Sequence, residues 1–189
     1  MRLRAWFILS ALFWASALHA QELSCRVVAL SDGDTFTCLD AFKTQHKVRL
    51  ANIDTPEKDQ PYRAKSKQIL SGLIFAKQVV VDAQTKDRYG RTIALVTTEG
   101  LNVNREMVER GAAWVYPHYN QDPSLPGLER QAQAASRGIW GLPKAQIIAP
   151  WEWRKLWRSL NSEFSTRNSR LKARQQPLQV PAASVCAGK

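Results

Sequence analysis

The chain has 189 residues, and its 27 Lys and Arg residues outnumber its 16 Asp and Glu residues, which gives a formal net charge of +11. Hydrophobic residues make up 44% of the sequence, so a wholly disordered chain is excluded. Three cysteines are too few for a small protein built on disulfides. Outside the N-terminus the sequence contains no run of about 20 apolar residues, so a polytopic membrane protein is excluded. The length therefore predicts one compact, basic domain with a tail.

Residues 1–20 have the layout of a secretory signal peptide. Arg2 and Arg4 precede an apolar stretch, and small alanines recur before the polar residues that follow. Cleavage is expected after Ala20, with Ala17 as the alternative, and an uncleaved anchor helix is the competing interpretation of this segment. We therefore expect export to the periplasm or the medium, where disulfides persist, and no stable membrane insertion once the signal is removed.

Short β-prone runs open the main domain, which is expected to span 21–150. The runs at 26–30 and 35–39 flank the turn Ser31-Asp32-Gly33-Asp34, which is a hairpin signal. The remaining predicted elements are a strand over 47–53, a helix over 61–76 with Pro61 in its first turn, strands at 79–82 and 92–96, and helices over 101–110 and 124–137 that end before Gly111 and Gly138. Strands this short and hairpin-linked predict an α+β, mostly β fold: a small Greek-key barrel with packed helices.

Two of the cysteines flank the first hairpin turn. In an antiparallel hairpin the residue numbers of facing positions add up to a constant, and for a hairpin centred on this turn Cys25 faces Cys38. Facing cysteines on antiparallel strands can meet disulfide distances. The sequence therefore predicts a Cys25–Cys38 bridge, with two buried free thiols as the alternative. Cys186 is left without a partner inside the chain, either free or available for an intermolecular bond.

The tail, 151–189, differs in composition from the main domain, because it carries eight basic and only two acidic residues. Trp153, Leu156, Trp157 and Leu160 follow helical spacing beside basic residues. The simplest interpretation is a basic, Trp-rich helix docked on the core, and the alternative is a helix that stacks on nucleic acid or lies on a membrane surface. The chain beyond about residue 161 is polar and is expected to be disordered.

Acidic residues gather in two turns that barrel closure would bring to one end. Asp34 ends the first hairpin turn, and Asp54 and Glu57 follow the third strand in the segment IDTPE. Convergent carboxylates need a cation nearby to stay ionised, and hard oxygen donors without His or Cys favour calcium over zinc. Taken singly, each motif is explained equally well by turn formation or helix capping.

Two arginines add to the acidic turns the parts that a phosphodiesterase needs. Arg49 lies five residues before Asp54, so a strand end or bulge near Asn52 is required to bring the two side chains together. Arg91 follows a charged turn in the second hairpin. Guanidinium groups and a metal stabilise charge on a pentacoordinate phosphate, while a spare carboxylate orients or deprotonates water.

These residues lie in five ordered motifs: VVALSDGDTF, VRLANIDTPE, DRYGRTIA, LNVNREMVERGAAWV and SRGIW. With this set, from about Cys25 to Trp140, the chain closely resembles the staphylococcal nuclease (thermonuclease) family. The resemblance implies a five-stranded Greek-key OB-fold barrel. It also implies calcium-dependent hydrolysis of DNA and RNA that leaves 3′-phosphate ends.

Carried over position by position, the resemblance implies a role for each residue of the site. The positions that match the family's calcium ligands are Asp34, Asp54 and the backbone carbonyl of Thr55. The positions that match its catalytic residues are Glu57, which activates water, and Arg49 and Arg91, which stabilise the transition state. The Trp-rich tail and the Cys25/Cys38 pair lie outside the founding pattern of the family.

The same resemblance implies a nucleotide-binding region. Arg88 and Tyr89 match positions that touch a terminal phosphate and the nucleotide, and Tyr119 matches a nucleotide-contacting tyrosine. The family's other tyrosine falls on Pro117, and Tyr116 is the candidate to replace it. Partial core packing is the alternative role for these tyrosines.

The expected function is that of an exported nuclease, acting as a monomer on DNA and RNA. Basic charge favours salt-dependent binding with little base readout, and aromatic rings favour single-stranded or frayed regions. The alternative from another class is a nucleic-acid-binding module without catalysis. Retention of Asp34, Arg49, Asp54, Glu57 and Arg91 together favours the enzyme.

Overall fold

The structure is a computed structural model that describes the backbone of residues 22–175 and the side chains of residues 22–167. The predicted signal peptide over 1–20, both of its cleavage points and Cys186 lie outside the described residues. So does the end of the predicted disordered tail, from residue 176 onward.

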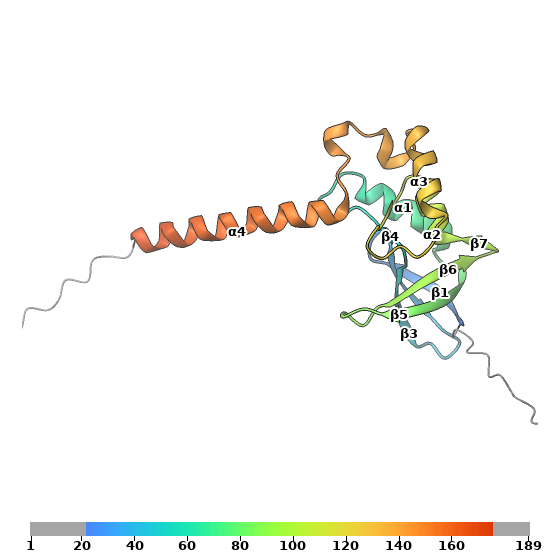
Figure 1. Ribbon diagram of the computed structural model, residues 1–189. Helices are drawn as coiled ribbons and strands as arrows, with labels where there is room; N and C mark the ends of the chain where they lie inside the picture. Colours follow the sequence, from blue (N-terminus) through green and yellow to red (C-terminus); the bar gives the residue numbers. More distant parts are fainter. Residues whose placement is uncertain (1–21, 176–189) are drawn as a thin grey trace, which may run out of the picture.

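Five strands close into a barrel (Figure 1). β1 (Glu22–Leu30) lies between β2 (Thr35–Leu39) and β5 (Gln78–Lys86), while β3 (Gln45–Leu50) pairs with β2 and β6 (Thr92–Thr98) pairs with β5. Parallel pairing of β3 with β6 completes the closure. Apolar side chains alternate along the strands and fill the interior, among them Val27, Phe36, Val48, Val81 and Val96. The predicted Greek-key, OB-like barrel is confirmed.

Further short strands lie beside the barrel. β7 (Leu101–Asn102) pairs antiparallel with β6, and β4 (Ile53–Asp54) pairs with β8 (Trp114–Val115) in a separate two-stranded sheet. The predicted strand over 47–53 is therefore divided in two. Asn52 has a φ of 67°, a left-handed conformation that no regular strand contains, and it turns the chain between β3 and β4.

Three helices pack against the barrel and share its core, to which they contribute Leu70, Ile74, Met107, Val108 and Leu125. They are α1 (Arg63–Ile74), α2 (Val103–Glu109) and α3 (Leu125–Ala134), and two 3-10 turns follow, η1 (Gly138–Gly141) and η2 (Lys144–Gln146). Pro61 was wrongly predicted to lie in the first turn of a helix, because Tyr62 has a φ of 71° and α1 starts after it. The helix predicted from 101 starts at 103, since residues 101–102 pair with β6 instead.

Asn104 ties α2 to the seam where the barrel closes. This side chain is buried, and its amide nitrogen donates to the carbonyl oxygens of Ala51 (3.0 Å) and Ala94 (3.2 Å). Its amide oxygen accepts from the N–H of Val96 at 3.0 Å. The side chain thus gives hydrogen bonds to three main-chain groups, although the Ala94 carbonyl also accepts from the N–H of Ala51 at 2.8 Å.

Cys25 and Cys38 form the predicted disulfide, with their Cα atoms 5.6 Å apart. The pairing argument behind that prediction was nevertheless wrong, because the residue opposite Cys38 is Val27, and Cys25 lies opposite Val79 of β5. A bulge between Val27 and Ala29 shifts the register of the hairpin. The bond therefore joins diagonal rather than facing positions.

α4 (Pro150–Gln175) starts beside the barrel and projects away from it (Figure 1). Leu156, Trp157 and Leu160 are more than half exposed, so the apolar stripe is not docked on the core as expected, and the helix continues through residues predicted to be disordered. The first turn of α4 contacts the barrel domain through ring and ion-pair interactions that involve Trp151 and Arg154. Within the described part of the chain, none of the helices is long and apolar enough to span a bilayer.

Candidate active site

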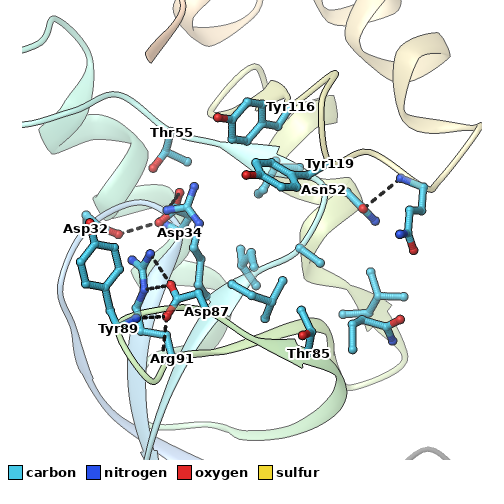
Figure 2. Close-up of a pocket in the computed structure, with 18 of the residues that line it drawn as sticks. Asp32, Asp34, Asn52, Thr55, Thr85, Asp87, Tyr89, Arg91, Tyr116 and Tyr119 are labelled. Atoms are coloured by element: carbon cyan, nitrogen blue, oxygen red, sulfur yellow. Dashed lines mark hydrogen bonds and ion pairs between the residues drawn. The ribbon is translucent and has the colours of Figure 1, made fainter. Parts of the chain in front are cut away.

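A cavity of about 1240 Å³ opens on the barrel where the β1–β2 turn, the segment after β3 and the β5–β6 hairpin meet. Figure 2 shows side chains from all three segments pointing into it. The predicted site residues that line the cavity are Asp34, Arg49, Thr55, Glu57, Arg88, Tyr89, Arg91, Tyr116 and Tyr119. Asp54, which is 1% exposed, contacts the lining residue Arg49.

Asp34 is held by the turn that precedes β2. Gly33 is required in this turn, since a Cβ there would lie 2.2 Å from Oγ of Ser66 in α1. The N–H of Asp34 donates to Asp32 Oδ1 at 3.2 Å, and Asp34 Oδ1 accepts from the Thr35 hydroxyl at 2.9 Å. Burial raises the pKa of Asp34 to about 8, although the neighbouring Arg49 acts in the opposite direction.

Arg49 joins the two buried aspartates. Its Nη1 lies 2.8 Å from Asp34 Oδ2, and its Nη2 donates to Asp54 Oδ1 at 2.8 Å. Arg49 and Asp54 reach each other because the left-handed residue Asn52 breaks the strand between them, as the odd spacing required. Burial opposes the charge on Arg49, but Asp34 and then Asp54 outweigh it and raise the pKa of the guanidinium.

Glu57 follows Asp54 in a loop and is about one-third exposed to the cavity. Its N–H donates to Oε1 of the buried Gln60 at 2.9 Å, and Gln60 Nε2 donates to the carbonyl oxygen of Ile148 at 2.6 Å. Gln60 therefore couples the Glu57 loop to the segment that leads into α4. Thr55 is buried in the same loop.

Arg91 enters the cavity from the second hairpin. Asp87 holds its guanidinium through Nε and Nη2, each 2.7 Å from Oδ2, and these hydrogen bonds lower the pKa of Asp87 against the opposing effect of burial. Nη1 of Arg91 donates to the Thr35 hydroxyl at 3.4 Å, and that hydroxyl in turn donates to Asp34. The Thr35 hydroxyl thus connects Arg91 to the buried carboxylate of Asp34.

Aromatic rings border the cavity on two sides (Figure 2). Tyr89 is 68% exposed, with the guanidinium groups of Arg88 and Arg91 at 4.8 and 5.5 Å from its ring centre. On the other side, Tyr116 and Tyr119 meet edge to face at 4.9 Å. Tyr89 and Tyr119 are open to solvent, so core packing does not account for either.

Sequence reasoning missed Arg154, which reaches the site from the first turn of α4. Its Nη2 lies 2.8 Å from Asp54 Oδ2, and its Nη1 donates to Glu57 Oε1. Trp151, one turn earlier on the same helix, stacks on Tyr116 with ring centres 5.3 Å apart and planes 2° from parallel. The sequence contains no spacing signal for this contact, because about 100 residues separate Arg154 from Asp54.

The donors present suit a hard divalent cation. The pocket combines two buried aspartates with Glu57, and all three offer only carboxylate oxygens, the ligands that calcium prefers. In the described part of the chain no three His, Cys, Asp or Glu side chains are already grouped as a metal site. The guanidinium groups of Arg49 and Arg154 ion-pair with these acids instead. The ligand types therefore suit calcium, and its binding requires the guanidinium of Arg49 or Arg154 to move away from the carboxylates.

The arrangement has the parts required for attack on a phosphodiester. Acids that can hold a cation lie at one end of the cavity, a partly exposed carboxylate lies beside them, and Arg91 lies across from them. Cationic groups around a scissile phosphate stabilise the charge that develops in the transition state. Exposed rings at the rim offer surfaces on which bases stack.

Comparisons with known proteins identify the family of the chain. The family model described as "Staphylococcal nuclease homologue" matches residues 47–141. An uncharacterized endonuclease of Haemophilus influenzae is 44% identical over 140 residues, which cover 74% of this chain and 78% of the relative. An uncharacterized endonuclease of Escherichia coli O157:H7 is 43% identical over 134 residues (70% and 86%), and a micrococcal nuclease of Shigella flexneri is 37% identical over 140 residues (68% and 79%). This chain therefore belongs to the staphylococcal nuclease family.

Proposed function

We propose that this chain is an exported, calcium-dependent nuclease that hydrolyses DNA and RNA with little sequence specificity and leaves 3′-phosphate ends. One observation carries the proposal: Asp34, Asp54 and Glu57 lie with Arg49 and Arg91 around a single cavity. Membership of the nuclease family supports the same reaction class.

Calcium would be held by Asp34, Asp54 and the carbonyl of Thr55, and when bound it supplies positive charge next to the scissile phosphate. Glu57 accepts a proton from the attacking water, because its carboxylate is the one acid of the three that is substantially exposed to the cavity. The oxygen of that water bonds to phosphorus as the bond to the 5′ oxygen breaks. The 5′ oxygen leaves as an alkoxide that takes up a proton from solvent, and the phosphate stays on the 3′ side.

Arg49 and Arg91 stabilise the negative charge that builds on the phosphate oxygens. Each guanidinium is oriented before substrate arrives, Arg49 by the two aspartates and Arg91 by Asp87. Preorganised donors of this kind need no reorganisation during the reaction, which is why they favour the transition state.

Binding is expected to depend on charge and stacking rather than on base identity. The net charge of +11 favours any polyanion, and such binding weakens as salt increases. Tyr89 and Tyr119 are exposed at the rim, where unpaired bases can stack on them. Single-stranded or frayed regions are therefore the preferred substrates, and a rigid duplex should be cut more slowly.

Export and monomeric action belong to the same proposal. The predicted signal peptide over 1–20 and the Cys25–Cys38 disulfide support an oxidising compartment, the periplasm or the medium. Fractionation of cells that express the full chain tests this. Retention of the protein in the cytoplasm with the signal peptide uncleaved would contradict export.

The function itself is tested by digestion of DNA and RNA while calcium is titrated, with end-group analysis of the products. We expect cleavage that EGTA abolishes and that yields 3′-phosphates. Glu57→Gln is the matched control, because it removes the proton acceptor and keeps the shape of the side chain. Binding of nucleic acid without degradation in calcium would instead identify a binding module.

A further inference from the structure

The first turn of α4 occupies part of the candidate active site. The helix begins at Pro150 and runs outward from the barrel (Figure 1), yet Arg154 points back into the cavity and lines it. The arginine is about one-third exposed, whereas Asp54 is almost completely buried. Arg154 therefore covers one of the predicted metal ligands from the solvent side.

Arg154 pairs with the carboxylate oxygens of one predicted calcium ligand, Asp54, and of the predicted proton acceptor, Glu57. Asp54 Oδ2 accepts from Arg154 Nη2 at 2.8 Å, and Asp54 Oδ1 is shared between Arg49 at 2.8 Å and Arg154 Nη1 at 3.4 Å. Glu57 Oε1 accepts from Arg154 Nη1. Burial alone would lower the pKa of Arg154, but Asp54 and then Glu57 raise it, so the group carries its charge at every working pH.

Two further contacts keep this turn in place. Trp151 stacks face to face on Tyr116 at 5.3 Å, and the guanidinium of Arg154 lies 5.9 Å from the centre of the same ring. Behind it, Gln60 links the Glu57 loop to Ile148, two residues before the helix. The turn is thus anchored on an aromatic ring and on the loop that carries Glu57.

We infer that Arg154 is an internal cation that competes with calcium for Asp54 while it pairs with the proton acceptor Glu57, so that the first turn of α4 sets the metal affinity of the site. This inference rests on the proposed function. A guanidinium and a calcium ion placed on the same carboxylate repel each other and draw on the same lone pairs, so metal binding at Asp54 weakens the Arg154 ion pairs. Because such coupling is reciprocal, any change that weakens the Arg154 contacts strengthens metal binding.

Trp151 acts in the same direction without carrying charge. Its stack on Tyr116 holds the turn from which Arg154 reaches the acids. Loss of the indole lets this turn move away, which weakens the competition while the charge of the site stays the same. A general electrostatic effect of the basic helix does not predict any effect of Trp151.

The test is calorimetric titration of calcium into the full chain without nucleic acid. Arg154→Gln is compared with Arg158→Gln, which removes the same charge one helical turn further along, where the side chain is exposed. We expect Arg154→Gln to bind calcium about fivefold or more tightly than wild type, within the usual range of coupling between two sites. Trp151→Ala should bind more tightly by a smaller factor, and Arg158→Gln should match wild type.

The outcomes separate the inference from the proposed function. If wild type binds calcium and digests DNA but Arg154→Gln binds no more tightly than Arg158→Gln, the competition is refuted and the nuclease assignment stands. Weaker binding by Arg154→Gln refutes it too, since the arginine would then support the metal-bound state. If neither wild type nor any variant binds calcium, the calcium site and the inference fall together. Thermal unfolding in EGTA verifies that each variant is folded.

Discussion

Removal of the Cys25–Cys38 disulfide should lower the free energy of unfolding by about 3 kcal/mol. The bond joins residues 13 apart in sequence, and closing a loop of that length restricts the unfolded chain by about this amount at 25 °C. Both cysteines are fully buried in the barrel, so the double variant Cys25→Ala/Cys38→Ala keeps the core apolar. For a chain of this size the loss corresponds to a decrease in Tm of roughly 6–12 °C.

Urea unfolding followed by tryptophan fluorescence measures this difference, with Cys186→Ala as the control. Cys186 lies outside the predicted hairpin, so the control should unfold like wild type. The disulfide closes the hairpin whose turn holds Asp34, but it does not line the cavity, and the double variant should stay active below its transition. The loop argument is refuted if the double variant and the control unfold with the same free energy.

Three further results are expected. Arg91→Ala should lower kcat by about 10²–10³ with an unchanged Tm, as is typical when one donor to the transition state is lost; steady-state digestion that matches wild type would contradict this. Calcium affinity should increase from pH 6 to pH 8, because burial raises the pKa of Asp34 to about 8 and the proton must leave before the metal binds. Calorimetry at each pH measures this, and Asp34→Asn should remove the dependence. Asn104→Ala should lower the free energy of unfolding by about 3 kcal/mol, since three main-chain groups lose a buried partner; denaturant unfolding within about 0.5 kcal/mol of wild type would contradict it.

The hairpins and the acidic turns were predictable because their signals are local. Short β-prone apolar runs mark β2 and β6, and Asp-Gly in the first turn marks the hairpin that presents Asp34. The sequence also indicated a break in the strand near Asn52, because the odd spacing between Arg49 and Asp54 requires one if their side chains are to meet. The strand period alone would place these two side chains on opposite faces, and the break at Asn52 is what brings them together.

Register and element ends were less predictable. The hairpin turn is centred on Gly33, since Leu30 lies opposite Phe36. The bulge between Val27 and Ala29 then places Cys38 opposite Val27, although the disulfide still forms. Pairing with β6 converts residues 101–102 from helix to strand. There a long-range hydrogen-bond partner outweighs the local preference of the chain.

The amino-acid pattern by itself indicated the barrel and the two acidic turns, because these rest on local spacing, whereas the roles of the acids and the arginines followed from the resemblance to the nuclease family. Only the tertiary structure decided that Arg154 enters the site and that Trp151 lies on Tyr116. Such contacts join segments that are far apart along the chain, and their existence depends on how the helix leaves the barrel. A basic residue on an amphipathic helix has no local feature that distinguishes a solvent-exposed charge from one that pairs with a buried carboxylate.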